Sequence, residues 1–94
     1  MSTETDDDFY TRADAHIQVA NDQTDKVGRG KVSASMMYAT ARFNSWVSAY
    51  TAESGDDLLE GKEKIIEYFV EQYRNMLAEN IDDYARNFDQ YMSR

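Results

Sequence analysis

Apolar residues recur at helical spacing in three stretches of the chain. The first stripe consists of Phe9, Ala13, Ile17 and Ala20. Their spacing of three or four residues predicts an amphipathic helix. Three aspartates at residues 6–8 precede the stripe, and their carboxylates suit the N-cap and the positive end of a helix dipole. We expect this first helix to end near Gln23.

The second stretch, from about Ser33 to Ala52, contains one charged residue, Arg42. One face of the predicted helix carries Met36, Ala39, Phe43, Val47 and Tyr50, and further apolar residues occupy other faces. A helix with so few charges is expected to be covered on more than one side. Its many polar residues argue against a membrane span.

The third stretch begins at Asp56 or Asp57, either of which can cap a helix, and keeps its apolar phase almost to the end of the chain. Ile66, Leu77 and Phe88 recur at eleven residues, as do Val70, Ile81 and Met92, and also Tyr73 and Tyr84. Eleven residues make three turns of a nearly straight helix. This pattern predicts a third helix that is much the longest of the three.

The length of this third helix raises a packing problem. Residues 56–92 as one helix would extend about 55 Å, whereas a compact domain of this size is about 30 Å across. Two solutions stay open. The helix breaks near Asn80 and folds its last turns back, or it stays continuous and its C-terminal half is covered by a second chain. The preserved phase favours the continuous helix with dimerisation.

The segment VGRGKVS, residues 27–33, resembles a phosphate-binding loop only superficially. That motif requires a glycine where this chain has Asp25, and Ser or Thr where it has Val32. The preceding residues also follow a helical pattern rather than that of a strand. We therefore interpret the segment as a helix–helix connection, in which Gly28 or Gly30 adopts a positive φ and Ser33 caps the next helix.

The composition supports an all-α fold. The chain has 94 residues, no proline and no cysteine. We predict a small three-helix bundle in a single helical domain, residues 6–94, after a disordered tip of residues 1–5. The absence of cysteine excludes disulfides and thiolate metal sites and suits the cytoplasm. The acidic N-terminus does not resemble a signal peptide, so we expect a soluble, unexported protein.

Charge is unevenly distributed along the chain. The formal net charge is −8, which disfavours binding to nucleic acid and to anionic membranes. Residues 26–52 nevertheless carry four basic residues and no acidic one, whereas the segments on either side are acidic. The acidic ends suit a basic protein partner as well as the basic segment of a second copy.

Three residues are candidates for a ligand site between helices: Arg42, Trp46 and His16. Arg42 is the unusual charge of its helix, and a buried guanidinium must be paired, with Asp14 or a carboxylate of the third helix as the natural partner. His16 could act as a general base, although a histidine at the edge of an apolar stripe is more often a packing residue. We expect no catalytic residue, cofactor or metal ion.

Four glutamates, Glu60, Glu63, Glu67 and Glu71, fall on one face of the third helix. Oxygen ligands of this kind bind Mg²⁺ or Ca²⁺, but the chain lacks the Glu-x-x-His pairs of di-iron bundles. A solvated acidic face is the simpler interpretation, supported by pairing of Glu60 with Lys64 and of Glu71 with Arg74.

Three segments together resemble a small proteobacterial family, the domain-of-unknown-function family 3144. They are DDDFYTRADAHIQVAN, GKVSASMMYATARFNSWV and YFVEQYRNMLAENIDDYARNFDQY, and they extend from about Asp6 to Met92. The resemblance implies a bacterial, cytoplasmic protein. It implies no activity, ligand or site.

These observations favour a non-catalytic protein–protein interaction protein that forms a homodimer. The candidate interface consists of Ile81, Tyr84, Phe88, Tyr91 and Met92, which extend beyond the reach of the other two helices. The alternative is a small-ligand-binding protein or enzyme with its pocket near Arg42, Trp46 and His16.

Overall fold

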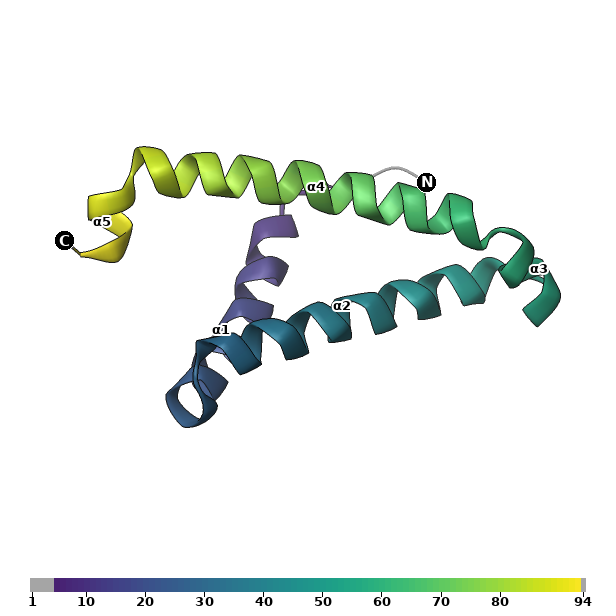
Figure 1. Ribbon diagram of the computed structural model, residues 1–94, viewed down its shortest axis with the longest axis horizontal. Helices are drawn as coiled ribbons and strands as arrows, with labels where there is room; N and C mark the ends of the chain where they lie inside the picture. The colour runs from purple at the N-terminus through teal and green to yellow at the C-terminus, as the bar shows by residue number, and fades with distance from the viewer. Residues whose placement is uncertain (1–4, 94) are drawn as a thin grey trace. The chain divides into compact units, whose positions relative to one another are not determined.

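The computed structural model describes residues 5–93, and within that range it contains α-helices and no strands (Figure 1). The helices are α1 (Phe9–Val27), α2 (Arg29–Thr51), α3 (Gly55–Glu60), α4 (Lys62–Arg86) and α5 (Phe88–Met92). The predicted all-α fold is thus confirmed. The predicted disordered tip lies outside the described residues, apart from Thr5.

Contacts along the chain divide it into two compact units, which meet in sequence between Ser54 and Gly55. The first unit contains α1 and α2. The second contains α3, α4 and α5. The predicted single domain stays a prediction.

The first unit is a helical hairpin connected by a single residue, Gly28. Its φ of 89° and ψ of 153° lie in a region that is open essentially to glycine alone. The Gly28 N–H donates to the Thr24 carbonyl at 3.2 Å, and the Gly28 carbonyl accepts from the Val32 N–H at 3.4 Å. The predicted helix–helix connection with a positive φ at Gly28 is therefore confirmed.

Two details of this connection differ from the prediction. The first helix continues to Val27 instead of ending near Gln23, because no helix-breaking residue occurs before Gly28. The second helix begins at Arg29, so Ser33 lies inside α2 and is not its cap. Asp8 occupies the N-cap position of α1 as predicted, but its side chain makes no capping hydrogen bond.

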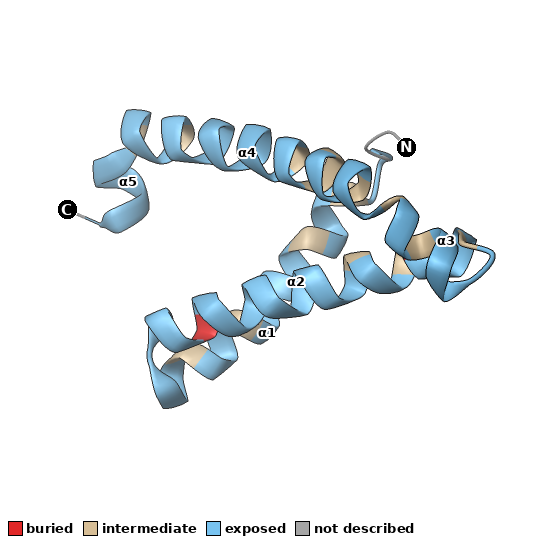
Figure 2. Ribbon diagram, turned by 45° about the vertical axis from the view of Figure 1, so that its right-hand side comes forward, coloured by how far each residue is buried: buried red, intermediate tan, exposed pale blue. Residues whose placement is uncertain are grey.

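Burial in the first unit is concentrated near its turn. Val32 is 5% exposed, and Ala20 and Thr24 on α1 are half-buried. The small side chains of α1 let α2 approach closely at this point. Ser48, farther along α2, is 7% exposed, and its hydroxyl donates to the Asn44 carbonyl at 3.0 Å. Figure 2 shows that most of the described ribbon is exposed.

The second unit consists of one long helix with a short helix at each end. Gly61 separates α3 from α4, although backbone hydrogen bonds continue across it, from the Gly61 N–H to the Asp57 carbonyl and from the Ile65 N–H to the Gly61 carbonyl. The third stretch of the sequence thus forms three helices rather than one.

The alternative of a break near Asn80 is wrong. The Asn80 amide donates to the Met76 carbonyl at 2.7 Å, so its polar group is satisfied on the surface of its own helix. No glycine or proline occurs nearby to interrupt the backbone. α4 continues to Arg86, and the interruption comes at Asn87.

Candidate functional site

The predicted ligand residues lie in the first unit, and all three of their side chains are exposed. Trp46 is 58% exposed. Arg42 forms no ion pair with Asp14, and its guanidinium is exposed instead of buried as predicted. The prediction inferred burial from the low charge of α2, but an exposed arginine is hydrated and needs no buried partner. The ligand role of Arg42, Trp46 and His16 stays a prediction.

Trp46 belongs to an aromatic ladder on α2, formed with Phe43 and Tyr50. The ring centroids of Phe43 and Trp46 are 5.7 Å apart, and those of Trp46 and Tyr50 are 5.4 Å apart. Spacings of three and four residues place the rings one above another on the helix surface. Phe43 and Tyr50 are 63% and 77% exposed, so the ladder presents a broad apolar surface.

The predicted acidic row is divided between two helices. Glu60 ends α3, whereas Glu63, Glu67 and Glu71 belong to α4, and all four are exposed. Neither of the predicted pairs, Glu60 with Lys64 or Glu71 with Arg74, closes into an ion pair in the described structure. Over residues 5–93, no group of three or more histidine, aspartate or glutamate side chains is arranged to hold a metal ion.

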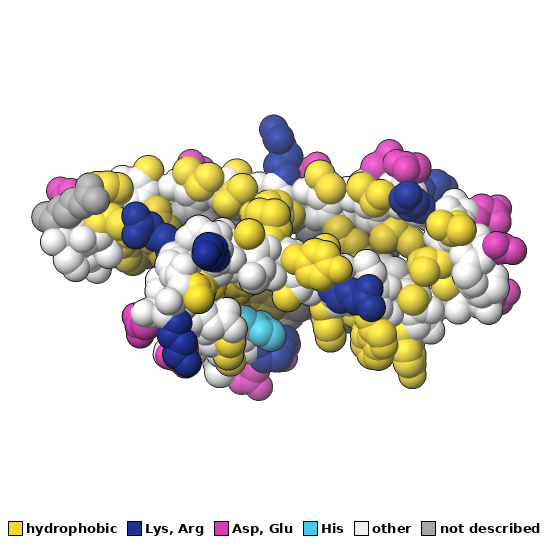
Figure 3. Space-filling view, turned by 60° about the horizontal axis from the view of Figure 1, so that its bottom comes forward, with side chains coloured by type: hydrophobic (Ala, Val, Ile, Leu, Met, Phe, Trp, Pro, Cys, Tyr) yellow, Lys and Arg dark blue, Asp and Glu magenta, His cyan; other side chains and the backbone are white. Residues whose placement is uncertain are grey.

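The candidate interface residues lie in the second unit, at the end of α4 and on α5. Ile81, Tyr84, Phe88, Tyr91 and Met92 are 58%, 48%, 44%, 44% and 42% exposed, respectively. They continue an apolar stripe on α4 that contains Ile66, Val70, Tyr73 and Leu77, which are also exposed. Hydrophobic side chains cover long stretches of the surface seen in Figure 3, with charged groups between them.

An elbow at Asn87 sets the direction of α5. Asn87 has φ −115° and ψ 30°, and its side-chain amide donates to the Asp83 carbonyl at 3.1 Å and to Asp83 Oδ1 at 3.0 Å. The Tyr91 hydroxyl donates to the other carboxylate oxygen, Asp83 Oδ2, at 2.8 Å. We call the hydrogen bond between the Tyr91 hydroxyl and Asp83 Oδ2 the latch. The Tyr91 ring also lies against Tyr84, with centroids 4.6 Å apart.

Comparison with known proteins places the chain in a family. The family described as "Protein of unknown function (DUF3144)" matches residues 9–85. The chain belongs to the DUF3144 family. This confirms the resemblance inferred from the sequence. The match begins at the first residue of α1 and ends just before the end of α4, so the elbow lies beyond it.

A solved structure is similar to this DUF3144 chain over nearly its whole length. It is the NMR structure of the protein NB7890A from a Shewanella species, which is 34% identical in sequence. The similarity covers 97% of each chain, with a TM-score of 0.76. No curated protein matches the chain. Among the described helices, none is both long and apolar enough to cross a membrane.

The latch changes the acidity of Tyr91 in this DUF3144 chain. The hydrogen bond that the hydroxyl donates to Asp83 raises the pKa of Tyr91 above its ordinary value of 10.0, and the charge of Asp83 adds to the effect. Both act because ionised Tyr91 would lose the hydrogen bond and face a carboxylate. The neighbouring Arg86 lowers the pKa in opposition.

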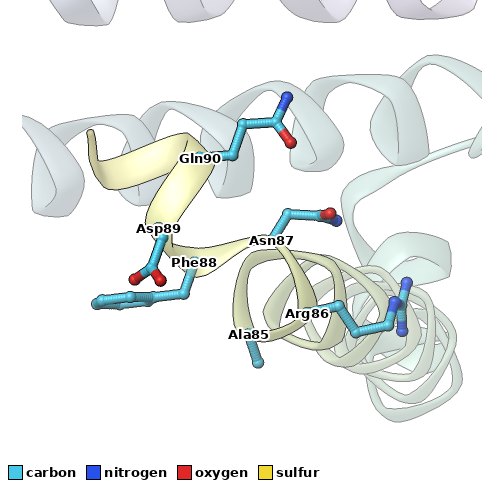
Figure 4. Close-up of a pocket in the computed structure, with 6 residues that line it drawn as sticks. All are labelled: Ala85, Arg86, Asn87, Phe88, Asp89 and Gln90. Carbon is cyan, nitrogen blue, oxygen red and sulfur yellow. The ribbon is translucent and has the colours of Figure 1, made fainter. Parts of the chain in front are cut away.

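A shallow hollow at the elbow is lined by Ala85, Arg86, Asn87, Phe88, Asp89 and Gln90. Figure 4 shows that these side chains point in different directions and do not converge on one point. A small-molecule site needs a few polar groups aimed at the same ligand. The hollow is therefore a consequence of the bend rather than a built site.

Sequence reasoning missed the latch. Asp83, Asn87 and Tyr91 follow one another at intervals of four residues, which places them on one side of a helix. Asparagine is a common helix terminator. The signal in the sequence is a carboxylate acceptor, Asp83, four residues before Asn87 and a hydroxyl donor, Tyr91, four residues after it. The alternative break predicted from the sequence lies at Asn80 and not at Asn87.

Proposed function

We propose that this DUF3144 protein is a small acidic, non-catalytic interaction protein of the bacterial cytoplasm that acts as a homodimer. Its helices pack as a small bundle, and its two copies join through the C-terminal half of α4 and α5. The observation that carries the proposal is the exposed apolar stripe of α4, which the other helices of its own unit are too short to cover.

The stripe needs a cover because of its length. α4 has 25 residues and is therefore about 37 Å long. α3 and α5 have six and five residues and adjoin its two ends. A lone helix in water is only marginally stable, and most helices owe their stability to packing of their apolar face. A contiguous exposed apolar stripe is also typical of an interaction surface.

A second copy of the chain suits the C-terminal part of this stripe. None of the five interface residues is charged, so the same patch on two copies can meet across a two-fold axis without opposing like charges. Five half-exposed large side chains offer roughly 100 Å² each. Two copies then bury about 1,000 Å², near the lower end for stable interfaces, and Tyr73 and Leu77 add to this.

Charge adds a weaker contribution. Lys26, Arg29 and Lys31 are exposed around the Gly28 turn, and Glu63 and Glu67 are exposed on α4. In a dimer, the basic turn of one copy could face the acidic side of α4 in the other. Exposed ion pairs contribute little to stability, so this pairing would guide association more than hold it. A basic protein would recognise the same acidic side.

The bacterial source, the cytoplasmic location and the non-catalytic role are inferred from other observations. A bacterial source is supported by the similar Shewanella protein, and cytoplasmic location is supported by the absence of cysteine. A non-catalytic role is supported by the scatter of the candidate chemical groups, because His16 and Arg42 are both exposed. Catalytic sites require such groups to be held in a fixed mutual geometry.

Sedimentation velocity over micromolar to millimolar concentrations tests the dimer. We expect a species of twice the chain mass of 10.9 kDa.

A thermal-shift screen of small metabolites tests the non-catalytic role. A ligand at a hundred times its Kd stabilises a protein by about 2.7 kcal/mol. We expect no such response, and a metabolite that produces one contradicts the proposal and favours the ligand site near Arg42, Trp46 and His16.

A further inference from the structure

The C-terminal segment has a sequence pattern that fits a straight helix and a structure that bends. At eleven-residue spacing, Phe88 follows Leu77 and Met92 follows Ile81. In a continuous helix, three turns separate the members of each pair, so α5 would extend the apolar stripe of α4 in line. The described structure instead ends α4 at Arg86 and redirects α5.

One residue separates the two forms. Asn87 alone lies between α4 and α5, and its φ of −115° and ψ of 30° differ from ordinary helical values of about −63° and −42°. The backbone N–H of Asn87 still donates to the Asp83 carbonyl at 3.1 Å, and the Tyr91 N–H donates to the Asn87 carbonyl at 3.0 Å. Helical hydrogen bonds thus persist on both sides of Asn87, across the elbow.

The latch belongs to the bent form only. Asp83 and Tyr91 are eight residues apart, which is about 12 Å along a straight helix. The two side chains cannot span that distance and still hydrogen bond at 2.8 Å. Tyr84 and Tyr91 would likewise be about 10.5 Å apart along the axis, whereas their rings are 4.6 Å apart in the structure. The contact between the Tyr84 and Tyr91 rings and the latch therefore both form only when the segment is bent.

The hydrogen bond from Tyr91 to Asp83 in the bent form is exposed to solvent. Tyr91 is exposed and Asp83 is half-buried, so water competes for the hydroxyl and the carboxylate that meet in the bent form. The straight form loses the latch but gains a continuous stripe. Such a balance is moved by any partner that binds one form better than the other.

We propose that α5 is a hinged segment, which is latched in the bent form in the free chain and straightens when a second copy docks on α4. This inference rests on the proposed homodimer. Straightening aligns Phe88 and Met92 with the stripe, so that two antiparallel helices can pack along its full length. The bend would interrupt that packing, and the latch therefore opposes dimerisation.

NMR spectroscopy reads the hinge directly. In dilute, monomeric chain we expect a nuclear Overhauser effect between the rings of Tyr84 and Tyr91 and non-helical Asn87 carbon shifts. In the dimer we expect that contact within one copy to disappear and the Asn87 shifts to become helical. An Asn87 that keeps its non-helical shifts in the dimer overturns the proposal.

Two variants test the coupling between hinge and dimer. Tyr91→Phe removes the latch hydroxyl and keeps the ring, and Asn87→Ala removes the amide and favours the helix. Each should lower the dimer Kd about two- to tenfold, the range expected for loss of one exposed hydrogen bond. Tyr68→Phe and Asn75→Ala make the same changes away from the interface and should leave the Kd unchanged.

The outcomes separate this inference from the proposed function. A chain that stays monomeric at millimolar concentration overturns the homodimer, and the coupling with it. A dimer whose Kd is unchanged or raised by both Tyr91→Phe and Asn87→Ala overturns the hinge coupling alone. A lowered Kd in both variants, with unchanged controls, supports it.

Discussion

The two long helices, α2 and α4, have similar lengths but very different surfaces. α2 carries three charged residues, Arg29, Lys31 and Arg42, and its apolar side chains surround the helix. α4 carries charges on most of its turns, and its apolar side chains form one stripe. The contrast teaches that apolar content alone does not define a binding face. A stripe bordered by charges specifies where a partner must lie, whereas a weakly charged helix does not.

The two units also differ in what lies at their bends. The first unit turns at Gly28 and buries Val32 beside the turn. None of the described residues of the second unit is buried, and polar side chains meet at its C-terminal bend. We therefore expect apolar-to-charged changes to act on association in the second unit, and backbone changes to act on folding in the first.

The largest expected effect is on the stripe. Tyr84→Glu combined with Phe88→Glu should raise the dimer Kd at least about a hundredfold, a loss of about 2.7 kcal/mol. The reason is that unpaired carboxylates would be buried between the two copies. Light scattering measures the change as a shift from dimer to monomer.

The matched control places the same number of charges on α2. Tyr38→Glu with Tyr50→Glu alters side chains that are 70% and 77% exposed, and should leave the dimer intact. If this control dissociates the dimer and the α4–α5 variant does not, the interface lies on α2 and the distinction between the two helices is wrong.

A smaller effect is expected at the turn of the first unit. Gly28→Ala forces a side-chain residue into a backbone region that costs about 1–3 kcal/mol outside glycine. Nothing lies within 4 Å of the added Cβ, so the cost comes from the backbone and not from a clash. Thermal unfolding should show a melting temperature lower by several degrees.

Gly30→Ala is the control, because Gly30 lies inside α2 and an added Cβ there also meets nothing within 4 Å. Replacing a helical glycine by alanine should stabilise the chain by about 0.5–1 kcal/mol. Equal responses of the two variants would show that the positive φ at Gly28 does not matter for stability.

The turn of the first unit could be predicted from the sequence, whereas the elbow of the second unit could not. The sequence predicts a positive φ at Gly28 or Gly30, because few residues other than glycine adopt one at a helix end, and Gly28 has it. Asn80 and Asn87 could not be ranked in the same way, because both are asparagines in helical phase. Both side-chain amides donate to the carbonyl four residues earlier, and only near Asn87 does a tyrosine, Tyr91, also bond to the carboxylate of Asp83.

The candidate site was predicted in part. The exposed stripe followed from periodicity, which records which side chains share a face. The prediction that Arg42 is buried was wrong, because the low charge of α2 does not determine how much of the helix is covered. The latch joins Asp83 and Tyr91, whose spacing in the sequence does not show that the helix bends between them.

Alkaline pH should act on the second unit. The folded-state pKa of Tyr91 is raised, so the latch is fully formed below the ordinary value of 10.0 and is lost as pH rises through the raised pKa. The groups that influence this titration are Asp83, Tyr84 and Arg86. The ring contact between Tyr84 and Tyr91, followed by NMR, should disappear over that range. Persistence of the contact after Tyr91 ionises would show that the latch does not hold the bend.

Acid pH should act, more weakly, on the first unit. Arg12 donates to both carboxylate oxygens of Asp6, at 2.7 and 3.2 Å, and this lowers the pKa of Asp6 below 3.8. The contribution is present above 3.8 and is lost as pH falls through the lowered pKa. Amide exchange at the start of α1 should increase there, and Arg12→Gln should remove the pH dependence. Both groups are exposed, so the effect on global stability should be small.

The most direct measurement of the central claim is an isotope-filtered Overhauser experiment on a mixture of labelled and unlabelled chains. It detects only contacts between copies. The account predicts intermolecular contacts among Ile81, Tyr84, Phe88 and Met92, because these side chains form the proposed interface. Intermolecular contacts confined to the aromatic ladder of α2, or none at millimolar concentration, would contradict it.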